Sequence, residues 1–452
     1  MKNLQIKKKG GIGLKRFVSL LLVAVMCICM LVSCMPNLKK YVVEYGSSPV
    51  AISDDEAQNE AYIDFLNKVN DFALKMNDSI SEQNAGINNF CLSPVAIYMS
   101  LAVACESSNG ETRQEILDAL GITYEQLYAY TRYLYSACNT EYTYIDNYDT
   151  EHVSAHEELA VSIWLNSNYN YKRSGVTALA KNYNCDVFSI PFHDGTANKI
   201  MGQYVEYKTH TIMGGDTNFK NDSSFALLSL FHLKEIWNAF GTNLAFTLEG
   251  YNFENTDGGI VTKQLLKSTY TGGVVKSTYY YDTFYIETEH GYKLHFMVPK
   301  YNYTVERVFT PNNIKRMLAI NDYGFIDDEN QQINYTRILF PQIDAYYSGN
   351  ISDVLQEDFA IEALFDKEKC DFSNLLSGDA YCNSFVHKAR MRLSAKGIEG
   401  DYINLAQSTH KPVQLPNYEK VYHEFILDRA FGFVLTDSDG MILYMGEINS
   451  LR

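Results

Sequence analysis

The 452-residue sequence lacks the short motifs that mark the common classes of enzyme. It contains no Gly-x-Ser-x-Gly nucleophile elbow, no His-Glu-x-x-His zinc motif, no phosphate-binding glycine loop and no dinucleotide fingerprint. Ser93 and His387 could be taken for a nucleophile and its base. Ser93 has the sequence context of a helix cap, however, and His387 lies in the middle of an apolar strand pattern, so we expect a buried hydrogen bond between them. The sequence therefore predicts that the protein is not an enzyme and needs no cofactor.

An excess of positive charge is also missing. Lys and Arg total 38 against 54 Asp and Glu, and the net charge is −16. The first 33 residues hold six basic residues and no acid, so removing them would give −16 − 6 = −22. Nucleic-acid binding is disfavoured, because it needs basic surface to neutralise phosphates.

The nine cysteines show no zinc-binding or redox spacing. Cys27 and Cys29 lie in the N-terminal segment, and Cys34 follows it. The other six are Cys91, Cys105, Cys138, Cys185, Cys370 and Cys382. Cys91 and Cys105 sit in apolar sequence and are interpreted as core residues. Cys370 and Cys382 could pair in an exported protein, but the sequence leaves the pairing open.

Histidine spacing gives no metal site either. His152 and His156 are four residues apart, as on one face of a helix, and no third ligand with motif spacing accompanies them. The pair is interpreted as part of a solvated helix face, and no metal is predicted.

The N-terminus has the pattern of an export signal. A basic region is followed by an apolar run, Phe17 to Leu31, which is short for a membrane span, and then by Leu-Val-Ser-Cys. This ending resembles a bacterial lipobox, which implies cleavage before Cys34 and acylation of its thiol. The alternatives are an ordinary signal peptide and an uncleaved anchor. Residues 35–57 have no apolar period and are predicted to form a flexible tether.

The rest of the chain alternates helix and strand patterns without an internal repeat. Three- and four-residue apolar steps predict a helix over 61–76, and Ser93 followed by Pro94 predicts the start of an apolar helix. Strands are predicted over 159–165, 183–192, 225–237, 293–299, 385–393, 425–433 and 441–448.

A long unpatterned segment separates two of these strands. From Ser394 to about Pro416 the residues are small, polar or turn-forming, and no face could be buried. Loops longer than about 12 to 15 residues in a compact domain are usually functional or disordered. The sequence therefore predicts a long exposed loop held between two core strands.

Several motifs, in order, resemble those of the serpin family. They are Asn88 to Leu101 (NNFCLSPVAIYMSL), Asn109 to Ile116 (NGETRQEI), Ala119-Leu120-Gly121, His387-Lys388-Ala389, Lys396-Gly397-Ile398-Glu399, Asp428-Arg429-Ala430-Phe431 and Leu443-Tyr444-Met445-Gly446. The resemblance covers the chain after about residue 60. It implies an α/β (mixed α+β) fold with a large central sheet, additional sheets, about eight or nine helices and an exposed reactive loop. The expected divisions are a signal peptide over 1–33, a tether over 34–57 and a monomeric serpin domain over 58–452.

The resemblance also implies which residues serve the loop, which is expected over about 394–424. Its hinge would be Lys396, Gly397, Ile398, Glu399, Gly400, Asp401 and Tyr402. Candidates for the scissile bond are His410, Lys411, Leu415, Tyr418, Glu419 and Lys420. Ser93, Ser229, Trp237 and His387 would lie where the sheet opens. Ala96, Ser229, Ala395, Ile398, Tyr402 and Asn404 depart from the residues that the family usually carries.

The function implied is that of an extracellular inhibitor of serine or cysteine proteases, held at the outer face of a membrane. A protease would cleave the loop, which would then insert into the large sheet. A non-inhibitory serpin acting as a protease decoy or binding module is the alternative. A surface lipoprotein that binds a polymer through its 35 tyrosines is a less favoured one.

Overall fold

The computed structural model describes residues 37–48, 53–145, 151–193, 195–210, 223–237, 244–268, 271–320, 322–382, 385–398 and 415–452. The expected signal peptide over 1–33 and Cys34 lie outside these residues, and so does the middle of the expected loop, 399–414. Among the described residues no helix combines the length and the apolar character needed to cross a membrane.

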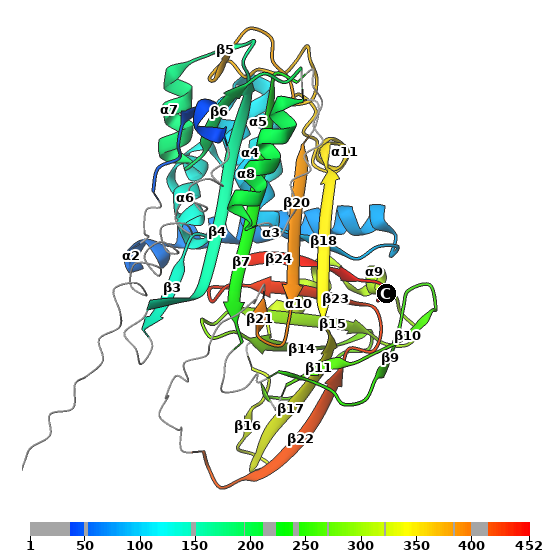
Figure 1. The fold of residues 1–452 in the computed structure, drawn as a ribbon. Helices are drawn as coiled ribbons and strands as arrows, with labels where there is room; N and C mark the ends of the chain where they lie inside the picture. Colours follow the sequence, from blue (N-terminus) through cyan, green and yellow to red (C-terminus); the bar gives the residue numbers. More distant parts are fainter. Residues whose placement is uncertain are drawn as a thin grey trace, which may run out of the picture.

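A large mixed sheet forms the centre of the molecule (Figure 1). Its strands follow the order β1-β6-β4-β7-β21-β20-β18, and β3 pairs with β4 at one end. Their bounds are β1 Val42–Glu44, β3 Glu141–Ile145, β4 Glu151–Asn166, β6 Asp186–Ile190, β7 Phe225–Ile236, β18 Ile343–Asn350, β20 Val386–Leu393 and β21 Gly397–Ile398. Strands far apart in sequence thus become neighbours, since β21 and β20 come from the C-terminal third of the chain.

Two six-stranded sheets lie at one end of the large sheet (Figure 1). The first has the order β13-β14-β15-β23-β24-β2, with β2 Phe90–Leu92, β13 Lys276–Ser277, β14 Tyr281–Glu287, β15 Lys293–Pro299, β23 Phe431–Thr436 and β24 Ile442–Ile448. The second contains β8 Ala245–Phe246, β11 Leu265–Lys267, β12 Thr271–Gly272, β16 Ile326–Asp327, β17 Gln332–Pro341 and β22 Glu419–Ile426. Two-stranded sheets pair β9 Tyr251–Glu254 with β10 Ile260–Lys263, and β5 Asn170–Tyr171 with β19 Leu376–Ser377.

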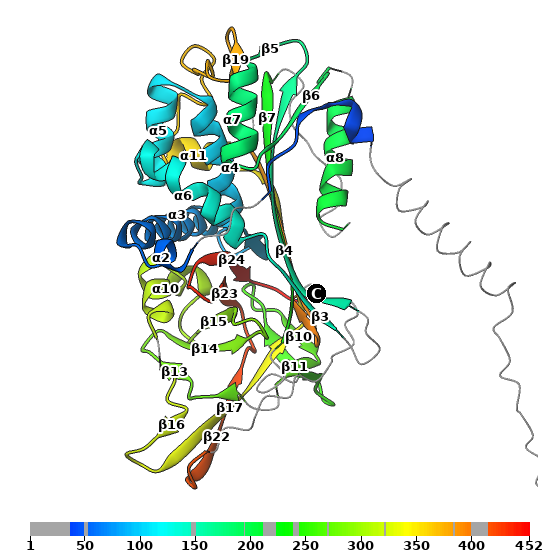
Figure 2. The same ribbon diagram turned by 90° about the vertical axis from the view of Figure 1, so that its left-hand side faces the viewer.

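Helices cover both faces of the large sheet (Figure 2). One face carries α3 Glu60–Asn84, α4 Pro94–Ser107, α5 Gly110–Leu120, α6 Tyr124–Ala137, α7 Arg173–Asn182 and α11 Ser352–Glu357, and α8 Thr196–Lys208 lies on the other. The shorter helices are η1 Asn37–Lys40, α2 Asp54–Ala57, α9 Val305–Val308 and α10 Pro311–Leu318. Because both faces are covered, β7 is an almost continuous buried apolar run, not an alternating one.

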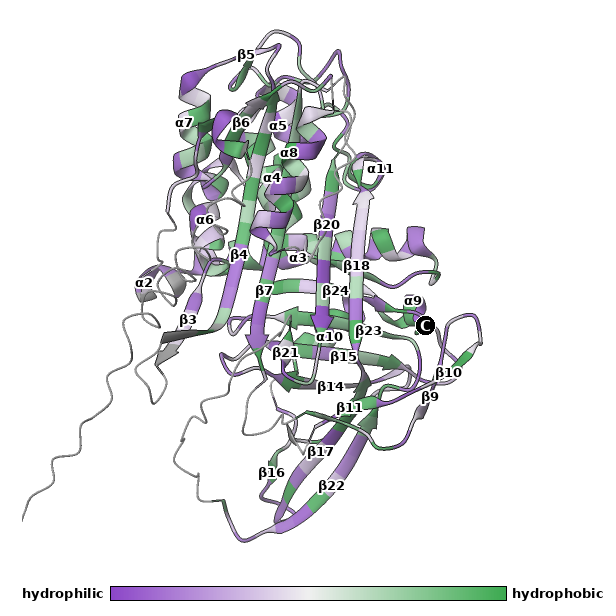
Figure 3. Cartoon of the chain, viewed as in Figure 1, coloured by the Kyte–Doolittle hydropathy of each residue, from purple (hydrophilic) through white to green (hydrophobic). Residues whose placement is uncertain are grey.

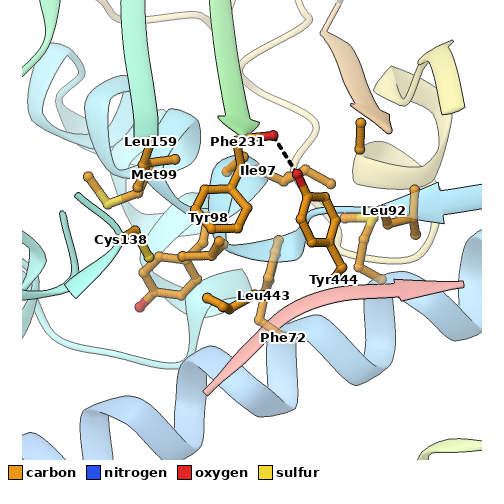
Figure 4. Close-up of a cluster of buried hydrophobic side chains, with 14 of the residues drawn as sticks. Phe72, Leu92, Ile97, Tyr98, Met99, Cys138, Leu159, Phe231, Leu443 and Tyr444 are labelled. Atoms are coloured by element: carbon orange, nitrogen blue, oxygen red, sulfur yellow. Dashed lines mark hydrogen bonds between the residues drawn. The ribbon is translucent and has the colours of Figure 1, made fainter. Parts of the chain in front are cut away.

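The core below the large sheet joins α3, α4, β7 and β24 (Figure 4). The Phe72 and Tyr98 rings meet edge to face at 5.5 Å, and the Phe231 and Tyr444 rings lie 5.2 Å apart. The Tyr444 hydroxyl donates a 2.6 Å hydrogen bond to the carbonyl oxygen of Phe231. A single buried side chain therefore ties the last strand of the chain to the middle of the large sheet.

Most of the predicted strands are confirmed. The strand predicted over 293–299 is β15, and those over 385–393 and 441–448 match β20 and β24 to within one residue. Phe385, His387, Ala389, Met391 and Leu393 are all fully buried, as their alternation predicts. The first helix, α3, is longer than predicted and continues to Asn84.

Three predictions about secondary structure are wrong. The strand predicted over 425–433 is the end of β22 and the start of β23, and these belong to different sheets. Residues 37–48, expected to be part of a flexible tether, include η1 and β1, and Val42 pairs with Phe188 at the edge of the sheet. Leu38 is buried in the apolar layer under α8, which explains why the segment docks although it has no periodic pattern. His156 lies in strand β4 and not on a helix face, because residues 156–165 pair with β7 and residues 151–156 pair with β3.

The core hydrogen bond yields the first testable prediction. Replacing Tyr444 with Phe leaves the buried carbonyl of Phe231 without this donor and should lower the free energy of unfolding by about 1 to 2 kcal/mol. The measurement is the urea midpoint at constant slope. Tyr128→Phe, at an exposed position of α6, is the matched control and should change the midpoint little. Equal midpoints for the two variants would contradict the assignment.

Candidate functional site

The predicted loop begins by turning back into the large sheet. Strand β20 ends at Leu393, and Ser394 to Lys396 form a turn closed by the Ser394 amide, which donates to the Gly397 carbonyl at 2.9 Å. The next two residues are β21, in which Ile398 pairs with Leu393 on one side and with Glu235 of β7 on the other. The hinge residues Gly397 and Ile398 therefore already lie inside the sheet, after Lys396 in the turn (Figure 1).

This short strand separates two long ones. Within the part of the chain that the structure describes, no ladder pairs β7 directly with β20, and β21 joins them. Strand β21 is antiparallel to both neighbours. A chain that continued in the same direction would fill the position between β7 and β20. The arrangement can therefore accept a longer central strand.

Gly397 is required by the close approach of β21 to β7. A Cβ atom on residue 397 would lie 2.0 Å from the carbonyl oxygen of Glu235 and 2.9 Å from the Cα of Ile236. Such contacts are too short for any side chain. Ile398, in contrast, has room for its side chain, which is fully buried in the sheet.

Trp237 holds the turn from the end of β7. Its indole Nε1 donates to the Ser394 carbonyl at 2.8 Å, and its amide donates to the Lys396 carbonyl at 3.4 Å. The side chain is buried and packs edge-on to Phe340. The structure thus brings Trp237 to the start of the loop, where the sequence comparison with the family placed it.

A buried acid lies at the same place. Glu235 has no exposed surface, and both of its carboxylate oxygens are 3.0 Å from Nδ1 of His290. Burial raises the pKa of Glu235, and the contact with His290 offsets part of that rise. The sequence analysis missed this pair because the two residues are distant in sequence and lie in no motif.

Ser93 and His387 meet beneath the sheet. The Ser93 amide, at the start of α4, donates to Nε2 of His387 at 3.2 Å. The predicted hydrogen bond is present, but it uses the serine backbone and not its hydroxyl. The hydroxyls of Ser93 and Ser229 and Nδ1 of His387 are buried without a hydrogen-bond partner. No nucleophile and base are therefore formed by this pair.

The far end of the loop differs from the prediction of an exposed segment reaching residue 424. Strand β22 begins at Glu419, and its residues Glu419 and Lys420 pair in parallel with Gln332 and Ile333 of β17. This strand lies at the edge of its sheet with one face in solvent, so its sequence lacks an apolar run. Leu415 is exposed, and the Tyr418 hydroxyl donates to Asp328 at 3.1 Å. The remaining hinge and scissile candidates, Glu399, Gly400, Asp401, Tyr402, His410 and Lys411, lie outside the described residues.

The contact of Gly397 with β7 can be tested by adding one methyl group. Gly397→Ala should displace β21 and cost about 1 to 3 kcal/mol, as overpacking of a rigid site does. Hydrogen–deuterium exchange should become faster in peptides covering 231–237 and 390–398. Lys396→Ala changes the exposed neighbour and is the control, with exchange expected to stay near that of the native chain. Unchanged exchange in Gly397→Ala would show that β21 is not held this way.

The buried histidine predicts a pH dependence. Burial lowers the pKa of His387 to about 3, against an ordinary value near 6.5, so the folded protein keeps it neutral. Below about pH 6.5 the unfolded chain takes up a proton that the folded chain refuses, and stability falls by roughly 1.4 kcal/mol per pH unit from this group. Between pH 7.5 and pH 5, His387→Gln should therefore lose about 2 kcal/mol less stability than the native protein, measured by urea unfolding.

His193→Gln, at an exposed position, is the control and should follow the native pH dependence. An identical loss in His387→Gln and in the native chain would mean that His387 is not kept neutral by burial.

The chain is similar in sequence and fold to known proteins. A sequence model of the family described as Serpin (serine protease inhibitor) matches residues 67–451. Rat alpha-1-antiproteinase is 22% identical over 414 residues, which cover 88% of this chain and 91% of the relative. Serpin48 of the insect Tenebrio molitor has 18% identity and a TM-score of 0.69, covering 86% and 99% of the two chains. Human thyroxine-binding globulin has 16% identity and a TM-score of 0.69 over the same shares.

The family match spans nearly the whole described fold, and the solved structures share its mixed α+β architecture around a large sheet. Members of this family are generally protease inhibitors and not enzymes. The chain belongs to the serpin family.

Proposed function

We propose that the protein is an extracellular inhibitor of serine or cysteine endopeptidases that acts by inserting its cleaved loop into the large sheet. The observation that supports this most directly is β21, which already occupies the first position between β7 and β20. The proposed bait lies between β21, which ends at Ile398, and β22, which begins at Glu419, and most of it falls in the 16 residues 399–414 outside the described part of the chain. The protein itself performs no catalysis.

In the proposed mechanism, insertion of the cleaved loop competes with hydrolysis of the acyl-enzyme. The protease attacks a peptide bond of the loop and forms an acyl ester, or a thioester in a cysteine protease, with its carbonyl carbon, and the new amino end is released. The freed N-terminal part of the loop then adds to β21 and extends it between β7 and β20, gaining backbone hydrogen bonds on both sides. The protease moves with it before water hydrolyses the ester.

Alternation along the inserted strand sets the side-chain requirements. Ile398 is buried, so residues of the same parity would also face the protein: Gly400, Tyr402, Asn404, Ala406 and Ser408. Tyr402 would need a partner for its hydroxyl and Asn404 several. These two residues favour the alternative function, a non-inhibitory serpin that is cleaved as a decoy or acts as a binding module, because slow insertion lets hydrolysis finish.

Strand β22 reduces the number of candidate positions for the scissile bond under this proposal. A protease binds an extended substrate whose backbone is not engaged in a sheet, and Glu419 and Lys420 are paired with β17. Residues His410, Lys411, Leu415 and Tyr418 therefore remain the proposed candidates. The bond after Lys411 leads into Pro412 and is the least suited of these.

The proposed location is the outer face of a cell membrane, with the chain anchored through an acylated Cys34. Only Met35 and Pro36 separate Cys34 from η1, which is part of the folded body. Two residues span at most about 7 Å. Under this proposal a monomeric serpin body would sit close to the lipid surface, with the edge of the sheet that contains β1 nearest to the anchor.

A third candidate, binding of a polymer, draws on a cluster of tyrosines. The rings of Tyr279, Tyr280 and Tyr303 meet at 5.1 to 6.2 Å, and Tyr301 stacks on Arg429 at 3.5 Å. Tyr301, Tyr303 and Arg429 line one small hollow. This cluster uses few of the 35 tyrosines, so polymer binding stays the least favoured function.

The test of inhibition is incubation of the full chain, extracted in mild detergent, with a panel of serine and cysteine proteases. We expect a covalent complex that survives denaturing electrophoresis, together with a released peptide whose mass marks the scissile bond. Cleavage of the loop without a complex by every protease would refute inhibition and favour the decoy.

Two matched variants separate insertion from recognition. Gly400→Asp places a charge on the face predicted to be buried, and Ile403→Asp places the same charge on the opposite face. We expect Gly400→Asp to convert the complex into cleaved product and Ile403→Asp to trap the protease like the native chain. Equal trapping by the two variants would argue against insertion in this register.

A further inference from the structure

Three histidines from three separate elements converge on the α8 side of the sheet. His156 belongs to β4, His232 belongs to the neighbouring strand β7, and His210 directly follows Thr209, the C-cap of α8. One ring nitrogen from each lies within 4.8 Å of the others. Figure 2 shows α8 lying along this face of the two strands. The cluster is separate from β21 and from the residues assigned to the loop.

His232 has the features of a ligand without its ion. Its side chain is 5% exposed, and neither ring nitrogen has a hydrogen-bond partner. Buried polar groups in folded proteins are nearly always satisfied, so a group left without partners calls for an explanation. A buried imidazole with both ring nitrogens unpartnered can offer either nitrogen to a metal ion.

Charged groups around the cluster suit a cation. Nε2 of His156 is 3.7 Å from a carboxylate oxygen of Glu158, and its Nδ1 is 3.4 Å from one of Glu141. Glu158 also binds Lys208 of α8 at 2.7 Å. A carboxylate beside a ligand histidine is the usual outer partner that orients the ring on a metal.

We propose that His156, His210 and His232 bind one divalent transition-metal ion, with Zn²⁺ as the best fit. Three imidazoles and one open position form a tetrahedral site, and Zn–N bonds of about 2.0 to 2.1 Å would place the nitrogens about 3.3 Å apart. Since the nitrogens lie within 4.8 Å of one another, the rings would need to close by at most about 1.5 Å. The fourth position would go to water or to Glu158. The ion joins the end of α8 to two strands of the sheet.

The sequence pattern could not find this site. In the sequence His156 pairs only with His152, and no third ligand follows at motif spacing. The two other ligands come from β7 and from the end of α8, and only the fold brings them together. Figure 3 shows hydrophilic residues in purple at the lower ends of β4 and β7, whereas the rest of these strands is largely apolar.

The test is direct metal binding to the full chain in mild detergent, without a histidine tag. Zn²⁺ is titrated by calorimetry, and Co²⁺ is added separately to record the intense visible bands of a tetrahedral site. We expect one Zn²⁺ per chain and a higher melting temperature with Zn²⁺. His210→Asn keeps a residue that tolerates the left-handed backbone at this position (φ 50°), and it should weaken Zn²⁺ at least about tenfold.

His156→Gln should have the same effect as His210→Asn, and the exposed His193→Gln should bind like the native chain. Absence of stoichiometric Zn²⁺ binding in the native chain, or native binding by both ligand variants, would overturn the proposal. The readouts use no protease, so they succeed or fail independently of the inhibitor function.

Discussion

The rest of the structure depends on one constraint, which is how the backbone groups between β7 and β20 find hydrogen-bond partners. Backbone N–H and C=O groups that are removed from water must find partners, and a strand placed between two others finds them on both sides. Strand β21 does so over only two residues. Under the proposed mechanism, the residues that follow Ile398 would satisfy further groups along both neighbours after cleavage. Gly397, Trp237 and the pair of Glu235 with His290 are grouped around the point where β21 stops.

The layer beneath this position contains more buried polar groups without hydrogen-bond partners than an ordinary core does. The hydroxyls of Ser93 and Ser229 and one ring nitrogen of His387 are buried without partners, and each such group costs about 1 to 3 kcal/mol. At Ser229 the family usually has an asparagine, whose longer side chain offers more hydrogen bonds. These costs fall on β7, on β20 and on the start of α4, which border the position that a new strand would take. Separating β7 from β20 for insertion costs less free energy when the closed sheet leaves buried polar groups without partners.

The bounds of β15, β20 and β24 could be predicted closely from the sequence. These strands have a regular apolar pattern and a buried face, and the pattern of apolar side chains is a local consequence of burial. The features that were missed depend on distant partners. Residues 37–48 dock through Leu38 and a few edge hydrogen bonds, and β22 forms because β17 offers a partner strand. Glu235 and His290, and the three histidines below α8, are brought together only by the fold. Local periodicity carries no information about such contacts.

Whether insertion outruns hydrolysis depends on side chains that follow the two residues already seated. Ile398 shows that the first inward position accepts a large apolar side chain, although an isoleucine departs from what the family resemblance leads one to expect there. The departure at Ile398 is therefore no obstacle by itself, since its burial is already complete before cleavage. The barrier shifts to Tyr402 and Asn404, whose polar groups must leave water before they can find partners. If the inner face offers those partners, through groups such as the unpaired hydroxyls beneath the sheet, the same unsatisfied atoms that weaken the closed sheet would favour the inserted strand.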